Sequence, residues 1–97
     1  GKTNILPFKD FPFLDHHFFD KDLNEDVVSI RPHEFKLIDD NNSMEKPHIK
    51  GRVVSIDSLG PFLEVSIDSG KFELIVHMDR NQKIETDHDL SFYIEKK

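Results

Sequence analysis

The sequence predicts an all-β domain of about five to six short strands with little helix. Apolar and polar residues alternate with a period of two along several runs of the 97-residue chain, as they do in half-buried strands. Turn signals rich in Gly, Pro and Ser separate these runs, and no internal repeat is visible. Five or six such strands in about a hundred residues fit a small, open Greek-key barrel of OB type.

The clearest pair of strands is a hairpin in the second half of the chain. Every second residue is apolar over residues 62–68, and the same alternation continues over residues 71–78. Ser69-Gly70 separates the two runs, and Gly adopts the positive φ that a tight turn requires. Phe72 and Phe92 are in phase with aliphatic neighbours, so we expect both in the core rather than as platforms for stacked bases.

Four further β-prone runs complete the predicted sheet. They are Val27–Ile30, Lys36–Ile38, His48–Asp57, which is entered through Pro47, and Leu90–Glu95. A polar loop over residues 39–46 joins the second run to the third, and Ser58-Leu59-Gly60-Pro61 forms the turn before the hairpin. We expect one domain over residues 1–97, with a Phe-rich N-terminal segment over 1–26 and the main barrel over 27–97.

The charge balance argues against several classes of partner. The chain carries 13 Lys and Arg against 19 Asp and Glu, a formal net charge of −6 at pH 7. A field of this sign repels phosphate backbones, so we expect neither nucleic acid nor an anionic membrane surface as the main partner. The chain has no Cys for a disulfide framework, and no run of about 18 apolar residues that could span a bilayer. A cytoplasmic location is therefore expected.

Catalytic and metal-binding motifs are sparse in the sequence. The chain has no Gly-rich phosphate loop, no Gly-x-Ser-x-Gly elbow and no His-Glu-x-x-His pair. Asp87-His88-Asp89 places carboxylates beside a base, but Thr86 is the only neighbouring nucleophile, which favours a solvated turn. Asp15-His16-His17 with Asp20 is the strongest metal constellation, yet adjacent histidines on an extended chain point apart. We therefore expect no catalytic residue, no metal site and no cofactor in this chain.

The first 26 residues contain five of the nine Phe residues. They are Phe8, Phe11, Phe13, Phe18 and Phe19. So small a core cannot bury all of these rings, and several exposed Phe in one place usually mark an interaction surface. We therefore expect either this segment or a sheet edge to supply an apolar contact between copies of the chain.

Three short sequence motifs, called strings below, follow one another along the chain. Gly1-Lys2-Thr3-Asn4-Ile5-Leu6-Pro7 is similar to G-x-x-N-x-[LF]-P, and Ile30-Arg31-Pro32-His33-Glu34 is similar to [VI]-R-P-[EH]-[DE]. The run from Gly51 to Gly60 is similar to G-x-V-x-x-[VI]-x-x-L-G. Together the strings resemble the C-terminal TOBE-type (transport-associated OB) regulatory domain of ABC-importer ATP-binding proteins, closest to the sulfate/thiosulfate or molybdate branch.

The resemblance implies a place in a longer ATPase whose N-terminal domain binds ATP and Mg²⁺. In that family two ATPase copies form a dimer beneath a membrane permease, and the C-terminal β domains meet each other and tune the cycle. The implied partners are a second copy of the subunit, the ATPase domain, the permease and a small oxyanion, at the inner face of the cell membrane. Because the net charge is −6, a sulfate-like ligand would need local positive groups such as Arg31 and His33, and Ser58 and Gly60 would form the turn of the third string.

Two features depart from the family's pattern. The Ser-x-Arg-Asn pattern of molybdate-binding relatives does not occur, and Thr86-Asp87-His88-Asp89 stands where the family has a Gly before its last strand. The second string also has a structural interpretation, in which Pro32 ends a strand and Arg31 pairs with a carboxylate. An OB-type nucleic-acid-binding module and a small oxyanion- or metal-binding domain therefore remain alternative functions.

Overall fold

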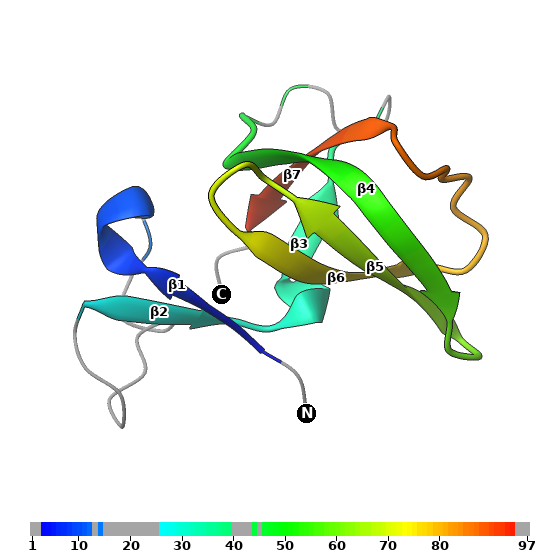
Figure 1. Cartoon of the computed structure of the whole chain (residues 1–97), viewed down its shortest axis with the longest axis horizontal. Helices are drawn as coiled ribbons and strands as arrows, with labels where there is room; N and C mark the ends of the chain where they lie inside the picture. The colour runs from blue at the N-terminus through cyan, green and yellow to red at the C-terminus, as the bar shows by residue number, and fades with distance from the viewer. Residues whose placement is uncertain (1–2, 13, 15–25, 40–43, 45, 95–97) are drawn as a thin grey trace.

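The computed structural model describes residues 3–12, 14, 26–39, 44 and 46–94. Within these residues the chain is all-β, as predicted: five antiparallel strands form a nearly closed barrel, and two more form a ribbon beside it (Figure 1). The strands are β1 (Asn4–Pro7), β2 (Val27–Ile30), β3 (Phe35–Leu37), β4 (Ile49–Ser58), β5 (Phe62–Asp68), β6 (Glu73–Asp79) and β7 (Asp89–Ile94).

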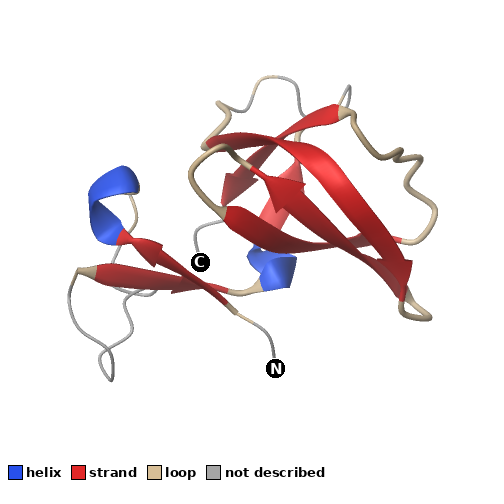
Figure 2. Ribbon diagram, in the orientation of Figure 1, coloured by secondary structure: helices blue, strands red, loops and turns tan. Residues whose placement is uncertain are grey.

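Helix is confined to short turns in the described part of the chain. The 3-10 turn η1 (Phe8–Asp10) follows β1, and the 3-10 turn η3 (Pro32–Glu34) joins β2 to β3 (Figure 2). The prediction of little helix is therefore confirmed. No helix in these residues has the length and apolar character needed to cross a membrane.

The barrel strands pair in the order β3-β7-β4-β5-β6, and every pair is antiparallel. The β5–β6 pair is the predicted hairpin, and Gly70 in its turn has a φ of 95°. β3 and β6 are the two edges of this sheet, and they lie close together as the sheet curls (Figure 1). The described residues form no hydrogen-bonded ladder between these edges, so the barrel is nearly rather than fully closed.

Alternation along the strands directs side chains into a single core. The inward-facing residues of β5 and β6 that the sequence predicted are fully buried, namely Val65, Ile67, Leu74 and Val76. Phe92 on β7 is also fully buried, which confirms its predicted place in the core. Phe72 is half-buried and packs against the same cluster.

The ribbon formed by β1 and β2 packs against this core. Its inner side chains, together with those following β1, belong to the buried cluster, namely Leu6, Phe11, Leu14, Val28 and Ile30. Phe11 is 2% exposed, and its ring centroid lies 6.3 Å from that of Phe72. Phe8 also packs partly against the core, so neither Phe8 nor Phe11 supplies the exposed surface expected from the Phe density. Phe13, Phe18 and Phe19 lie outside the described residues.

β1 is the one described strand that was not predicted from the sequence. It is four residues long and ends in Pro7, so it has too few alternating positions for a period of two to be detected. The other six strands lie where they were predicted, with ends shifted by no more than two residues. β4, for example, spans residues 49–58 rather than 48–57.

Asn4 joins the ribbon to the barrel through its side-chain amide. Nδ2 donates to the carbonyl oxygen of Ile30 at 3.0 Å and to that of Ile75 on β6 at 2.9 Å. The backbone N–H of Ile75 donates to Asn4 Oδ1 at 2.8 Å. The amide thus pairs with the edge of β6 as the backbone of another strand would. Asn4 is 6% exposed, so these bonds are largely shielded from water.

Two irregular backbone positions shape the approach of β7 to β4. The β4–β5 register shifts between Val53 and Ser55, and Asp87 has a φ of 68°. Asp87 N–H donates to the carbonyl oxygen of Val53 at 2.8 Å, and Val53 N–H donates to that of His88 at 2.9 Å. A left-handed φ is strained for a residue with a Cβ, so Gly would adopt this conformation more readily than Asp87 does.

Replacing Asn4 by Ala is expected to lower the free energy of unfolding by about 2–3 kcal/mol, because the N–H and C=O of Ile75 lose their partner and the carbonyl oxygen of Ile30 loses one hydrogen bond. Urea denaturation followed by circular dichroism measures this change. Thr3→Ala is the matched control, since it removes an exposed hydroxyl from the adjacent position and should cost less than about 0.5 kcal/mol. Equal losses in the two variants would contradict the role of the amide.

Replacing Asp87 by Gly is expected to raise the free energy of unfolding by about 0.5–1 kcal/mol, because relief of the left-handed strain outweighs the added freedom of the unfolded chain. The same substitution at Asp57, inside β4, should lower it by about 0.5–1 kcal/mol. Thermal unfolding of both variants measures the difference. A loss of stability on Asp87→Gly as large as that on Asp57→Gly would refute the strain argument.

Candidate functional site

The string around Arg31 forms the corner at which the chain leaves the ribbon for the barrel. Arg31 is extended, with φ −74° and ψ 150°, and Pro32 begins η3, where its fixed φ suits the first position of a helical turn. Glu34 N–H donates to the carbonyl oxygen of Arg31 at 2.9 Å, and Arg31 N–H donates to Glu34 Oε1 at 2.8 Å. Glu34 is 7% exposed, so its carboxylate is fixed inside the corner.

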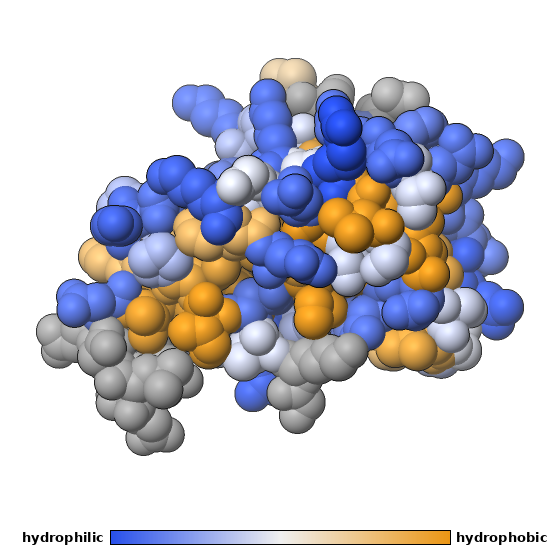
Figure 3. Space-filling model, viewed as in Figure 1, coloured by the Kyte–Doolittle hydropathy of each residue, from blue (hydrophilic) through white to orange (hydrophobic). Residues whose placement is uncertain are grey.

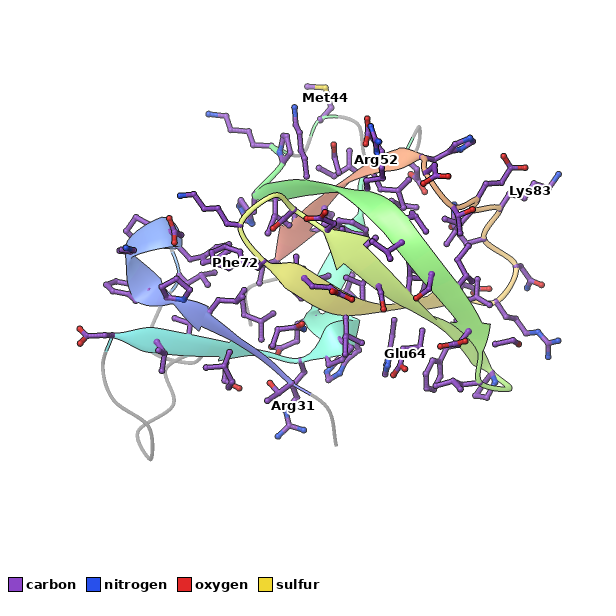
Figure 4. The ribbon with its side chains drawn as sticks, in the orientation of Figure 1. Arg31, Met44, Arg52, Glu64, Phe72 and Lys83 are labelled. Carbon is purple, nitrogen blue, oxygen red and sulfur yellow. The ribbon has the colours of Figure 1, made fainter. Side chains whose placement is uncertain are left out.

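The side chains of Arg31 and His33 are both exposed at this corner. Figure 4 shows the Arg31 side chain extending away from the ribbon. The structural interpretation expected Arg31 to pair with a carboxylate, but no ion pair of its guanidinium is present within the described ranges. The carboxylate of Glu34 instead bonds to the backbone of Arg31, which leaves the guanidinium available to solvent or a ligand.

Two hydroxyl groups share the outer face of the ribbon with Arg31. Asn4 pairs with Ile30 in the ladder, so the position before Asn4, Thr3, lies across from Arg31. Thr3 Oγ1 lies 2.8 Å from Ser29 Oγ. We call the surface formed by Thr3, Ser29 and Arg31 the ribbon patch. One of these hydroxyls donates its proton to the other, so the patch offers one hydroxyl and a guanidinium as hydrogen-bond donors on an open face, a combination that suits an oxyanion.

Thr3 and Ser29 were not recognised as candidate residues from the sequence. They are 26 positions apart, and only the antiparallel register of the ribbon brings them together. Because β1 itself escaped prediction, no pairing partner for Ser29 could be inferred. No local pattern in the sequence indicates this contact, because it depends on the pairing of two distant segments.

Two other basic side chains are already paired with carboxylates. Arg52 Nε lies 3.4 Å from Asp89 Oδ1, and Lys71 Nζ lies 3.1 Å from Asp10 Oδ1. Arg52 and Asp89 both line a pocket of about 440 Å³ beside β4, together with Lys50, Gly51, Asp68, Ser69 and Gly70. Two basic and two acidic side chains balance in this lining, so its charge favours neither an anion nor a cation.

Ser58 and Gly60 form the turn that connects β4 to β5. Ser58 ends β4 opposite Leu63, and Leu59 N–H donates to the carbonyl oxygen of Phe62 at 2.9 Å. Gly60 has a φ of 79° and is exposed, with nothing near the place where a Cβ would project. Its backbone conformation, not lack of space, is therefore what makes Gly suitable there.

Gly51, at the start of the third string, has the opposite reason to be Gly. A Cβ there would collide with Ile67 Cγ2 and would lie 2.8 Å from the carbonyl oxygen of Asp68. β4 and β5 could not approach so closely with a larger residue at this position. The third string therefore begins and ends at positions where the fold restricts the choice of amino acid.

The candidate catalytic and metal-binding residues are placed as follows. His88 Nε2 lies 3.3 Å from Glu85 Oε2, both side chains are mostly exposed, and Thr86 is exposed as well. The described residues contain no group of three or more His, Asp or Glu that could hold a metal ion. The constellation Asp15-His16-His17 with Asp20 lies outside the described residues.

A partly buried histidine–carboxylate pair lies on the outer face of the β5–β6 hairpin. His77 Nε2 is 3.2 Å from Glu64 Oε1, and the imidazole stacks on Phe62 with ring centroids 4.3 Å apart. The two residues face each other in the ladder, so their contact follows from strand register. Neither residue was predicted from the sequence to be functional.

Comparison with protein-family models finds none that matches the chain, and comparison with curated proteins finds no match either. The established level of classification is therefore the fold, a small five-stranded, nearly closed antiparallel barrel consistent with OB-like folds. The resemblance to TOBE domains continues to rest on the three short strings.

Proposed function

We propose that the chain is a TOBE-type accessory domain of the ATP-binding subunit of an ABC importer, where it mediates subunit contacts or substrate-linked regulation. The observation that carries this proposal is that each of the three strings contains residues at which the chain turns or two strands meet closely. The first contains Asn4, the second forms the corner at η3, and the third runs from Gly51 to Gly60. At these positions the backbone geometry or the packing restricts which residue type fits, so the match to the family's pattern supports a shared architecture.

In this role the domain regulates transport and contacts other subunits, and another domain of the subunit hydrolyses ATP. ATP and Mg²⁺ would be held by that other domain. The barrel would contact a second copy of the subunit, the ATPase domain and the permease, at the cytoplasmic face of the membrane. The proposed regulatory ligand is a sulfate-like oxyanion, and the ribbon patch is the surface that would receive it, because hydroxyl and guanidinium groups donate to such oxygens.

The coding sequence that precedes Gly1 is expected to encode a Walker A loop, Gly-x-x-x-x-Gly-Lys-Ser/Thr, and an ABC signature, because both belong to the ATPase domain of such subunits. Sequencing the surrounding gene provides the measurement. An upstream coding sequence that contains neither motif would refute the assignment to an importer subunit.

Sulfate is expected to shift the amide NMR signals of the ribbon patch at millimolar concentration, and Arg31→Gln should weaken this binding about tenfold, roughly the contribution of one charge-assisted hydrogen bond. Molybdate and tungstate are titrated in parallel to compare oxyanions. Arg80→Gln is the matched control, since it removes the same charge from an exposed turn after β6. Equal weakening by both substitutions would contradict a local site. An absence of shifts with all three anions would remove the sensing role and leave subunit contact as the proposal.

A further inference from the structure

The gap between β3 and β6 contains a pocket of about 270 Å³, which we call the seam pocket. Buried Phe35 and Met78, with half-buried Leu37, give it an apolar inner wall. β3 and β6 belong to opposite edges of the sheet, so the pocket lies where no ladder closes the barrel. A concave site with an apolar wall and a few polar groups is the usual form of a small-ligand site.

Charged groups from both edges line this pocket. Asp39 follows β3, and Asp79 ends β6. Among the described residues that line the pocket Lys36 is the only Lys or Arg, so within this set two carboxylates stand against one ammonium. His77 also lines the pocket, and its Nε2 is 3.2 Å from Glu64 Oε1, which brings a third carboxylate near. The balance of charge is therefore negative and favours a cation.

The shape of the lining favours a planar cation on an apolar stem. A guanidinium group donates two parallel hydrogen bonds to a carboxylate and stacks on aromatic rings, and Tyr93 provides such a ring in this pocket. An alkyl stem can lie against Leu37 and Met78, as the stems of long basic side chains lie on apolar surface. An ammonium is a compact and strongly hydrated charge, so it gains less from an aromatic wall.

We propose that the seam pocket binds an alkylguanidinium group, the functional group of arginine, supplied either by a polypeptide or by free arginine. Asp39 and Asp79 provide the charge that attracts it, Tyr93 the stacking surface, and Gln82 an amide for orientation. The site uses none of the residues of the ribbon patch and does not depend on the transporter assignment.

The probe for this proposal is N-acetyl-L-arginine amide, titrated at pH 7.5 into the chain with ¹³C-labelled methyl groups. The methyl signals of Leu37 and Met78 are expected to shift in a saturable manner, with a Kd on the order of 1 mM. N-acetyl-L-citrulline amide has nearly the same shape without the charge, and it should bind at least about tenfold more weakly. Free L-arginine identifies the source, because tighter binding of the blocked form indicates a polypeptide and tighter binding of the free form indicates the amino acid.

Substitutions locate the binding within the pocket. Asp79→Asn keeps the Oδ1 acceptor that Asn81 N–H uses at 2.8 Å, so the turn is retained while the charge is lost. This variant should weaken binding of the arginine probe about tenfold. Gln82→Ala should weaken it about threefold. Asp57→Asn is the matched control, since it removes the same charge from an exposed position of β4 outside the pocket, and it should leave the Kd unchanged.

Three results would overturn the proposal. The first is the absence of saturable methyl shifts at probe concentrations well above the expected Kd. The second is equal binding of the citrulline and arginine probes, which would exclude recognition of the charge. The third is equal weakening by Asp57→Asn and Asp79→Asn, which would attribute the binding to the overall field of the chain rather than to the pocket.

Discussion

The pairing of the Asn4 amide with the backbone of Ile75 fixes the ribbon against the barrel. β6 is an edge strand, and its outward N–H and C=O groups would be costly to bury without partners. One side chain satisfies both groups of Ile75 and holds the ribbon at a set distance from β6. The apolar side chains behind it, including Leu6, Val28 and Ile30, can then complete the core. The ribbon is therefore part of the same hydrophobic unit as the barrel.

The same arrangement determines which parts of the fold remain open. Asn4 and η3 cover the outer edge of β6, while β3 approaches that edge without forming a ladder. The open seam is therefore lined by side chains rather than by paired backbone in the described residues. On the other side of the ribbon, the face opposite Asn4 and Leu6 carries hydroxyl groups and a guanidinium, with Ile5 44% exposed between them. Figure 3 shows this mixture of hydrophilic and hydrophobic side chains around the ribbon and the barrel.

The sequence predicted the elements whose side chains alternate over many residues. β5 was predicted with its observed bounds, and the burial of Phe92 followed from its phase. The sequence did not predict what depends on contacts between distant segments. Asn4 meets Ile75 across 71 positions, and Thr3 meets Ser29 across 26, so neither contact leaves a local pattern. The left-handed φ of 68° at Asp87 could not be predicted either, because it is set by the bonds that join this residue to β4.

The residues that carry the family resemblance and the residues that could bind a ligand are largely different sets. Asn4, Pro32, Gly51 and Gly60 have backbone or packing reasons for their identity, so a match at these positions is informative about architecture. In the two proposed sites ligand choice depends instead on side chains such as Arg31 and Asp79, whose identity the fold leaves open. A net charge of −6 assists a cation at the seam pocket and opposes an anion at the ribbon patch. An oxyanion at Arg31 must therefore gain its affinity from local hydrogen bonds, because the overall field works against it.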